Sequence, residues 1–303
     1  MAGAESWAGA AAALARSPEA EAVWRLGPVR LGYIDYLNTL PVYYGIEKGI
    51  IDLPVAIKKG VPAELNRLFL AGGLDITPIS SIEFARHADQ CILLPDLSIS
   101  ADGRVGSIFL FTRKPVREVR RVALTSHSAT SVVLTRILLR ELYGVEPEYL
   151  TMDPDLGAML AVADAALIIG DAAIITAYRV AQGEYPGVEA LDLGAEWKRL
   201  TGCPMVYALW VIRRDFADRS PDGIRLVARL LQESQAYAWS RPQELIAEGV
   251  RRRGLPEPVV AEYFQLIRHE FGPRYREGLR IFLEYAQRLG ELDRVPELVV
   301  WGE

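Results

Sequence analysis

The order of strand and helix signals constrains this 303-residue chain more than any other feature. From Val29 onward, short β-branched and aromatic runs alternate with segments whose apolar residues recur at helical spacing. The run VRLGYI is the first predicted strand, and a helix is predicted after Asn38. Because strands that alternate with helices are typical of α/β folds, the chain is predicted to be an α/β protein.

Two longer strand candidates, GSIFLFTRKP at 106–115 and MVYALWVIRRD at 205–215, enclose a compact α/β stretch. The simplest architecture is one lobe made from both ends of the chain, with a second lobe inserted as its middle. The two long strands are then the crossovers. We predict a discontinuous first domain at 29–113 plus 206–303, an inserted second domain at 114–205, and a cleft between them.

Composition limits the cellular compartment in which the protein is expected and the classes of partner that it is expected to bind. Residues 1–28 are alanine-rich but lack the basic start and apolar run of a signal peptide, so we expect a disordered or weakly helical leader. No run approaches the ~18 apolar residues of a membrane-spanning helix. The net charge of −5 gives no electrostatic footprint for nucleic acid. Two cysteines without CxxC spacing fit a reducing compartment. We therefore expect a cytoplasmic protein that contacts neither membrane nor nucleic acid.

Small polar residues follow several predicted strands at the points where helices begin. Such corners occur in YLNTLP, TPISSIE, TSHSATS and IIGDAA, and a Gly-Ser step opens the first long strand. Ligands of open α/β sheets bind outside the carboxyl ends of strands, and helix N-termini favour anions. Each of these residues is also a standard helix cap, but together they predict a polar cleft for a small anion, without an obvious cation. The candidate binding residues are Ser80, Ser81, Gly106, Ser107, Ser128, Thr130 and Ser131.

Few residues are candidates for acid–base chemistry. His87 and His269 fall in predicted helices beside charged residues and are expected on the surface. His127 lies one residue before a helix cap and is either a general base or an exposed loop residue. Asp171 is either a base or a helix cap, and Asn38 follows the first strand. No dinucleotide-binding, Walker, zinc-protease or nucleophile-elbow motif occurs.

Several of these stretches resemble one family, the chorismate dehydratases of the futalosine route to menaquinone (the MqnA family). The matching stretches are collinear, cover about residues 29–213, and read YLNTLPVYYG, VPAELNRLFLAGGLDITPISSIEFAR, LLPDLSISADGRVGSIFLF, LTSHSATSVVLTRILL, ALIIGDAAI and DLGAEWKRLTGCPMVYALWVIR. The resemblance implies a type II periplasmic-binding-protein-like fold, with two lobes, a central cleft and two crossover strands.

The resemblance also implies a carbon–oxygen lyase, more narrowly a hydro-lyase. An enzyme of this family converts chorismate to 3-[(1-carboxyvinyl)oxy]benzoate and water, the first step of the futalosine route, without metal or organic cofactor. Chorismate is a small dicarboxylate, which suits a cleft of hydroxyls and helix N-termini. We expect an E1cB-like elimination in which Asn38 assists the departing hydroxyl or the dienolate and the hydroxyl residues hold the carboxylates. The proton goes to the substrate's own enolpyruvyl carboxylate, to His127 or to Asp171.

Two other functions fit the same residues. The sister enzyme of the route, 1,4-dihydroxy-6-naphthoate synthase, shares the fold, but YLNTLP, SADGRVGS and DLGAEWKRLTG favour the dehydratase. A non-enzymatic protein that closes on a small anion is the other alternative, and the missing signal peptide counts against it. The apolar content of the C-terminal helices permits a homodimer.

Overall fold

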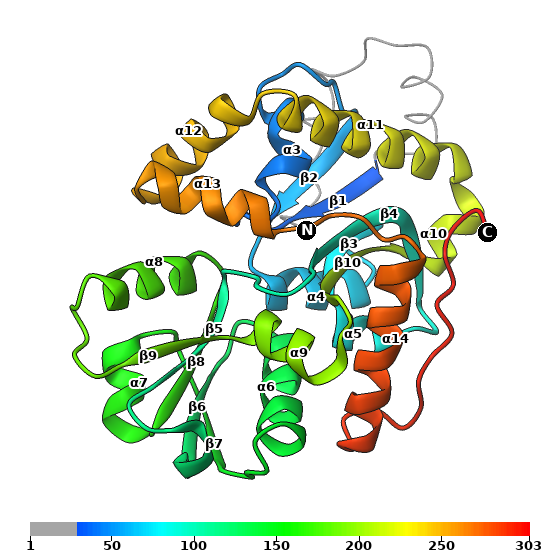
Figure 1. Ribbon diagram of the computed structural model, residues 1–303. Helices are drawn as coiled ribbons and strands as arrows, with labels where there is room; N and C mark the ends of the chain where they lie inside the picture. Colours follow the sequence, from blue (N-terminus) through cyan, green and yellow to red (C-terminus); the bar gives the residue numbers. More distant parts are fainter. Residues whose placement is uncertain (1–28) are drawn as a thin grey trace.

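The computed structural model describes residues 29–303, and the leader predicted at 1–28 lies outside the described residues. Figure 1 shows two lobes side by side, with the chain passing between them. Each lobe contains a five-stranded mixed sheet, ordered β2-β1-β3-β10-β4 in the first lobe and β7-β6-β8-β5-β9 in the second. The predicted two-lobed α/β fold is confirmed.

The first sheet consists of β1 (Val29–Tyr33), β2 (Val55–Lys59), β3 (Ile76–Ser80), β4 (Cys91–Ala101) and β10 (Met205–Arg213). Strands β1, β2 and β3 are parallel, and β10 runs antiparallel between β3 and β4. One face packs against α3 (Leu40–Glu47), α11 (Pro221–Trp239), α12 (Pro242–Arg253) and α13 (Glu257–Leu266). The other face packs against α4 (Pro62–Leu70), α5 (Ser81–Arg86) and α14 (Pro273–Arg288), and the short α10 (Arg214–Arg219) follows β10.

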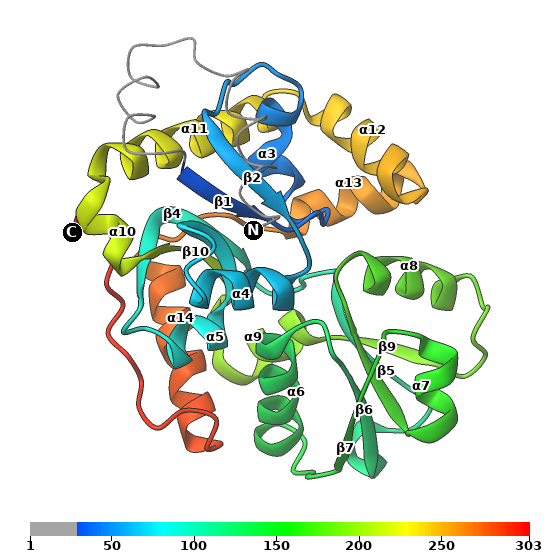
Figure 2. The same cartoon turned by 180° about the vertical axis from the view of Figure 1, so that it is seen from behind.

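The second sheet consists of β5 (Ile108–Thr112), β6 (Arg121–Thr125), β7 (Glu148–Met152), β8 (Ala165–Ile169) and β9 (Glu189–Asp192). Strand β6 is parallel to β7 and β8, whereas β5 runs antiparallel to β8 and β9. The lobe also contains a 3-10 turn, η1 (Val116–Glu118), and the helices α6 (Ala129–Glu141), α7 (Leu156–Val162) and α8 (Gly170–Ala181). Helix α9 (Leu193–Thr201) follows β9 in the segment that returns to the first lobe. Helices α7 and α8 pack on one face of this sheet and α6 and α9 on the other. In Figure 2, α8 lies beside α12 and α13 of the first lobe.

The chain crosses between the lobes twice, at 102–107 after β4 and at 193–204 after β9. Each predicted long strand is the first strand after a crossing and not the crossing itself. The predicted boundary at 113–114 therefore moves back to 102–107, because β5 pairs along its length with β8 and β9 of the second sheet. The other predicted boundary, at 205–206, falls at the start of β10.

Asp192 ties the two crossings together at one point. Its carboxylate accepts hydrogen bonds from the amides of Val105 and Gly106 in the first crossing, at 3.1 and 2.8 Å. It also accepts the Gly194 amide at 2.9 Å, at the start of α9. A methyl group at Gly194 would lie 2.4 Å from the carbonyl oxygen of Gly103, so this close approach requires glycine.

The lobes also share an apolar core. Buried side chains of α5 and α14 in the first lobe and of α6 in the second belong to one continuous cluster, which includes Ile82, Leu283 and Val133. Residues in such a cluster lose dispersion contacts and re-expose apolar surface when they separate. The lobes are therefore packed together on the side of α5, α6 and α14.

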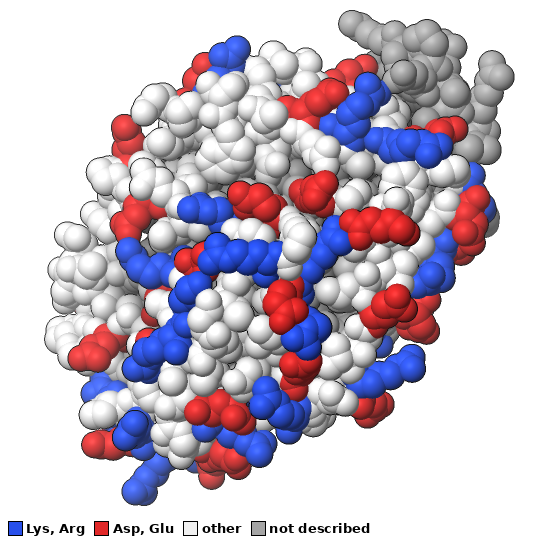
Figure 3. All heavy atoms as spheres, turned by 45° about the vertical axis from the view of Figure 1, so that its right-hand side comes forward, with Lys and Arg blue, Asp and Glu red and all other residues white. Residues whose placement is uncertain are grey.

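On the face seen in Figure 3, acidic and basic side chains are interspersed. That face presents no extended area of a single charge sign. None of the helices in the described part, 29–303, has the length and apolar character that crossing a bilayer requires.

Candidate functional site

A cleft of about 700 Å³ lies between the lobes. On the first-lobe side it is bounded by the β1–α3 loop, by α4 and by the start of α5. On the second-lobe side it is bounded by the β6–α6 and β8–α8 corners. The structure thus brings together six of the predicted site residues, which are Asn38, Ser80, Ser107, His127, Ser128 and Ser131.

Three predicted binding residues have partners outside the cleft lining. Ser81 is buried, and its hydroxyl donates to the carbonyl of Val206 at 2.7 Å. The Thr130 hydroxyl accepts the Ile82 amide at 3.1 Å and so links α6 to α5. The Gly106 amide is bound in the crossing described above. All three build the walls of the cleft.

Asp171, a predicted candidate base, is also engaged elsewhere. It lies in the first turn of α8 and accepts the Leu37 amide at 3.0 Å. Arg253, at the end of α12, forms an ion pair with the same carboxylate. The carboxylate therefore spans the two lobes beside the loop that carries Asn38.

His269 is not a surface residue, as the sequence predicted, but holds this loop from inside the first lobe. It lies in an extended segment that pairs with β4, and only 5% of it is exposed. Burial lowers the pKa of His269 from 6.5 to about 4, so the ring is neutral at pH 7. Nε2 donates to the carbonyl oxygen of Asn38 at 2.7 Å.

Unpaired polar atoms concentrate in the cleft. Within residues 29–303, five buried side-chain polar atoms have no hydrogen-bond partner, and four of them belong to residues that line the cleft. These four are Asn38 Oδ1, Asn66 Oδ1, Ser80 Oγ and Tyr207 Oη. Buried polar atoms are normally paired, so this concentration indicates a site built for a polar ligand.

Helix α4 supplies a cation that sequence reasoning missed. Leu65 and Phe69 of α4 are buried in the core, and the next stripe of the helix, which includes Asn66 and Arg67, lines the cleft. The Arg67 guanidinium forms no ion pair within residues 29–303 and is available to an anion. Helical spacing identifies the core stripe and therefore also the residues on either side of it. Spacing alone does not show which of these two sides of the helix lines a cleft.

The start of α6 offers a second anion-binding element. Ser128 caps this 13-residue helix, and its hydroxyl accepts the Ser131 amide at 3.2 Å and donates to the Ser131 hydroxyl at 3.0 Å. The N-terminus of a helix carries partial positive charge. His127 lies directly before this cap, and its own amide donates to Thr125 Oγ1 at 3.2 Å.

Two further residues, Glu83 and Tyr207, were not predicted and line the cleft. Glu83 is paired with Arg86 at 2.6 Å, which accounts for its charge. Burial raises the pKa of Tyr207 well above its usual value, so the phenol remains a hydrogen-bond donor. Within residues 29–303 no three His, Cys, Asp or Glu side chains converge in a geometry suited to a metal ion.

The two lobes and their mixed sheets define the fold class, the two-lobed fold of the periplasmic-binding-protein type. The periplasmic aliphatic sulphonate binding protein of Escherichia coli matches with a TM-score of 0.61 at 17% identity, over 90% of this chain and 91% of that chain. At this identity the likeness shows the fold alone.

Sequence comparison identifies the family within that class. The family model described as menaquinone biosynthesis matches residues 29–288, and the chain belongs to this family. It is 34% identical over 269 residues to the chorismate dehydratase of Thermus thermophilus, covering 85% of this chain and 94% of that protein. It is 27% identical over 222 residues to the 1,4-dihydroxy-6-naphtoate synthase of the same organism, covering 72% of this chain and 77% of that protein.

Proposed function

We propose that the protein is a chorismate dehydratase, a hydro-lyase that converts chorismate to 3-[(1-carboxyvinyl)oxy]benzoate and water. The observation that carries the proposal is the cleft itself. Its lining includes four residues that each have a buried polar atom without a partner among residues 29–303, an arginine without an ion pair in the same range, and a capped helix N-terminus. The carboxylates of a dicarboxylate accept hydrogen bonds from the Ser80 and Tyr207 hydroxyls and from the guanidinium, and a substrate hydroxyl donates to one of the two amide oxygens. The higher identity to the dehydratase of Thermus thermophilus than to its naphtoate synthase also supports this choice.

The two lobes hold opposite ends of the substrate in this proposal. Arg67 of α4 in the first lobe pairs with one carboxylate, because a guanidinium matches carboxylate geometry. The start of α6 in the second lobe, with Ser128 and Ser131, binds the other carboxylate. Ser80 and Ser107 add hydroxyl contacts from the two sides. Binding across both lobes orients the ring between them.

The elimination proceeds through loss of the C3 proton and then of the C4 hydroxyl. The C3 proton is acidic because its carbanion delocalises through the C1=C2 bond into the ring carboxylate. Positioned donors stabilise that charge as it develops, and the Asn38 amide is one of them or donates to the departing hydroxyl. The hydroxyl leaves as water after it gains a proton, and the ring becomes aromatic.

The proton acceptor in this proposal is the enolpyruvyl carboxylate of the substrate, which reaches C3 through a six-membered arrangement. Two observations support this assignment. Both carboxylate oxygens of Asp171 already accept hydrogen bonds, from Leu37 and from Arg253. The charge of Glu83 is paired with Arg86. His127 is the protein group in the cleft that competes for this role.

Two alanine variants distinguish these acceptors. We expect Asn38→Ala to lower kcat by about 10²–10³-fold, the loss typical of one donor to a developing anion. His127→Ala is expected to keep turnover within about threefold of wild type, because in this proposal His127 accepts no proton. If His127 were the general base, its loss would cost about 10²–10⁴-fold. Loss of turnover in His127→Ala, with substrate binding intact, contradicts substrate assistance.

The activity itself is tested by incubating purified protein with chorismate and buffer alone. The expected product is aromatic and lighter than chorismate by one water, as seen by absorbance and mass spectrometry. Saturable binding without product supports the anion-binding alternative. Turnover of a cyclic futalosine-derived substrate, with none of chorismate, supports the naphthoate synthase.

A further inference from the structure

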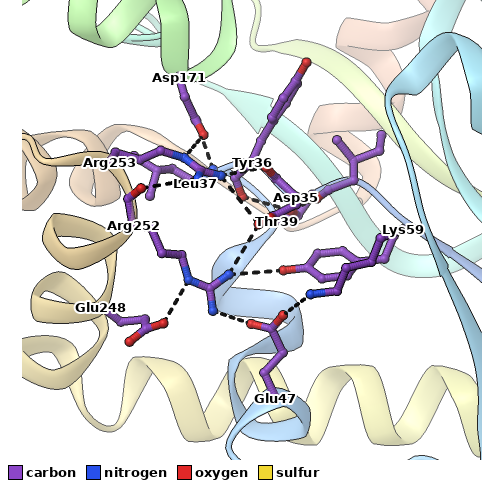
Figure 4. Close-up of polar contacts among 12 residues, drawn as sticks. Asp35, Tyr36, Leu37, Thr39, Glu47, Lys59, Asp171, Glu248, Arg252 and Arg253 are labelled. Carbon is purple, nitrogen blue, oxygen red and sulfur yellow. Dashed lines mark hydrogen bonds and ion pairs between the residues drawn. The ribbon is translucent and has the colours of Figure 1, made fainter.

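Figure 4 shows a polar network around the β1–α3 loop, which carries Asn38. Thr39 closes the loop locally, since its hydroxyl donates to the Tyr36 carbonyl at 2.9 Å. Within the first lobe, Nη2 of Arg253 donates to the Asp35 carbonyl at 2.7 Å. The loop is thus fixed to α12 of its own lobe.

The second lobe holds the same loop through Asp171. Oδ1 of Asp171 accepts the Leu37 amide at 3.0 Å, and Oδ2 accepts Nε of Arg253. The side chain points from α8 toward the loop in Figure 4. Only 9% of Asp171 is exposed, and burial raises its pKa against the opposite effects of the Leu37 amide and Arg253. The contact therefore uses both oxygens of a buried carboxylate.

The backbone around Asn38 is held from two directions. Asp171 binds the amide of the preceding residue, Leu37, and His269 binds the carbonyl of Asn38 at 2.7 Å. Neither contact uses the side chain of Asn38, a residue of the cleft lining whose buried Oδ1 has no partner among residues 29–303. A fixed backbone with a free amide side chain is the arrangement that a preorganised hydrogen-bonding group requires.

We propose that Asp171 is a positioning residue for Asn38, and that from the second lobe it holds the Leu37 amide so that the Asn38 side chain meets the substrate. Arg253 orients the carboxylate. The inference rests on the proposed function and extends it, because Asn38 belongs to the first lobe but is placed correctly only while the second lobe is docked against it. A carboxylate is needed, since one oxygen faces an amide and the other faces a guanidinium.

The first test compares Asp171→Asn and Arg253→Gln in the full-length protein. Both are expected to lower kcat for chorismate by about 10–100-fold and to change KM by less than about threefold, because misplacement of a catalytic group by about 1 Å costs about 10²-fold. Arg136→Gln is the matched control, since it removes another ion pair between the lobes, with Glu291. The control is expected to stay within about twofold of wild type.

Arg253 distinguishes positioning from base catalysis. An arginine is not deprotonated in proteins and cannot be the base, so similar losses in both variants support positioning. If Arg253→Gln keeps full kcat and Asp171→Asn loses it, Asp171 acts as a base and the proposal is overturned. Arg253→Lys, which retains a cation, is expected to recover part of the activity and covers the case in which Arg253→Gln does not fold.

A double-mutant cycle asks whether Asp171 acts through Asn38. In an Asn38→Ala background, Asp171→Asn is expected to lower kcat further by less than about threefold, because two residues that act as a unit are not additive. Losses that multiply instead show independent roles and overturn the proposal.

Hydrogen exchange of residues 34–39 provides a readout that needs no substrate. Asp171→Asn is expected to speed exchange of the Leu37 amide by at least about tenfold, and Arg136→Gln is expected to leave it unchanged. Unchanged exchange in Asp171→Asn overturns the proposal whatever the substrate is. A different outcome is that the wild-type protein does not convert chorismate while Asp171→Asn speeds exchange of the Leu37 amide as expected. That outcome contradicts the proposed function, but it supports the contact by which Asp171 holds the loop.

Discussion

The buried histidine behind the cleft makes the stability of the protein depend on pH in a calculable way. His269 has a pKa of about 4 in the folded protein, against an ordinary value of 6.5, because burial disfavours its charged form. Between these two values the unfolded chain binds a proton that the folded protein does not. Stability is therefore fully present above pH 6.5 and is lost as the pH falls toward 4.

The size of this effect follows from the two pKa values. At about 1.4 kcal/mol for each tenfold change in proton affinity, a difference of about 2.5 corresponds to about 3 kcal/mol between pH 7 and pH 4. His269→Gln removes the titration but keeps a donor for the Asn38 carbonyl. The free energy of unfolding of this variant is expected to fall by about 3 kcal/mol less than that of wild type over the same range.

Urea unfolding at pH 7, 5.5 and 4 measures this difference. His87→Gln is the matched control, because it removes a half-buried histidine on the surface of the first lobe, 3.8 Å from Glu83. The control is expected to retain the wild-type loss of stability. If the pH curves of wild type and His269→Gln run parallel, His269 is not buried as a neutral ring and the reasoning is refuted.

The remaining predictions concern the cleft and the crossing. Arg67→Gln is expected to raise KM for chorismate by about 10–100-fold with a smaller change in kcat, because a hydrogen bond to a charged group contributes about 1.5–3 kcal/mol; steady-state kinetics with an unchanged KM contradict a carboxylate contact. Gly194→Ala is expected to destabilise the protein by about 1–3 kcal/mol, since its methyl group would lie 2.4 Å from the Gly103 carbonyl oxygen. Thermal unfolding checks this, and an unchanged midpoint shows that the crossing can shift at little cost.

Local sequence patterns predicted the alternation of strands and helices and both lobes, because each element carries its own periodicity and caps. They did not predict β4, in which Pro95 interrupts the strand signal and Asp96 adopts a positive φ of 53°. They also did not show that β10 lies between β3 and β4, because that pairing depends on residues far apart in the chain.

The sequence predicted which strand-to-helix corners form the site, but it did not predict which side chains of each corner line the cleft. Ser80 and Ser81 are neighbours, yet Ser80 lines the cleft and Ser81 is buried against β10. Successive residues of a helix differ by about 100° in direction, so a cap motif does not show which hydroxyl faces a ligand. His269 was misplaced for a similar reason. In an extended segment its charged neighbours point outward while the ring points in, because side chains alternate between faces.

The position of β10 has a consequence for how the chain is made. The ribosome releases β3 and β4 and then the whole second lobe before β10 exists, because β10 begins only at Met205. During that time β3 and β4 lack the strand that joins them, and unpaired strand edges promote aggregation. A chain that stops after the second lobe therefore has a complete second sheet, but its first sheet lacks β10 and leaves β3 and β4 unpaired with each other.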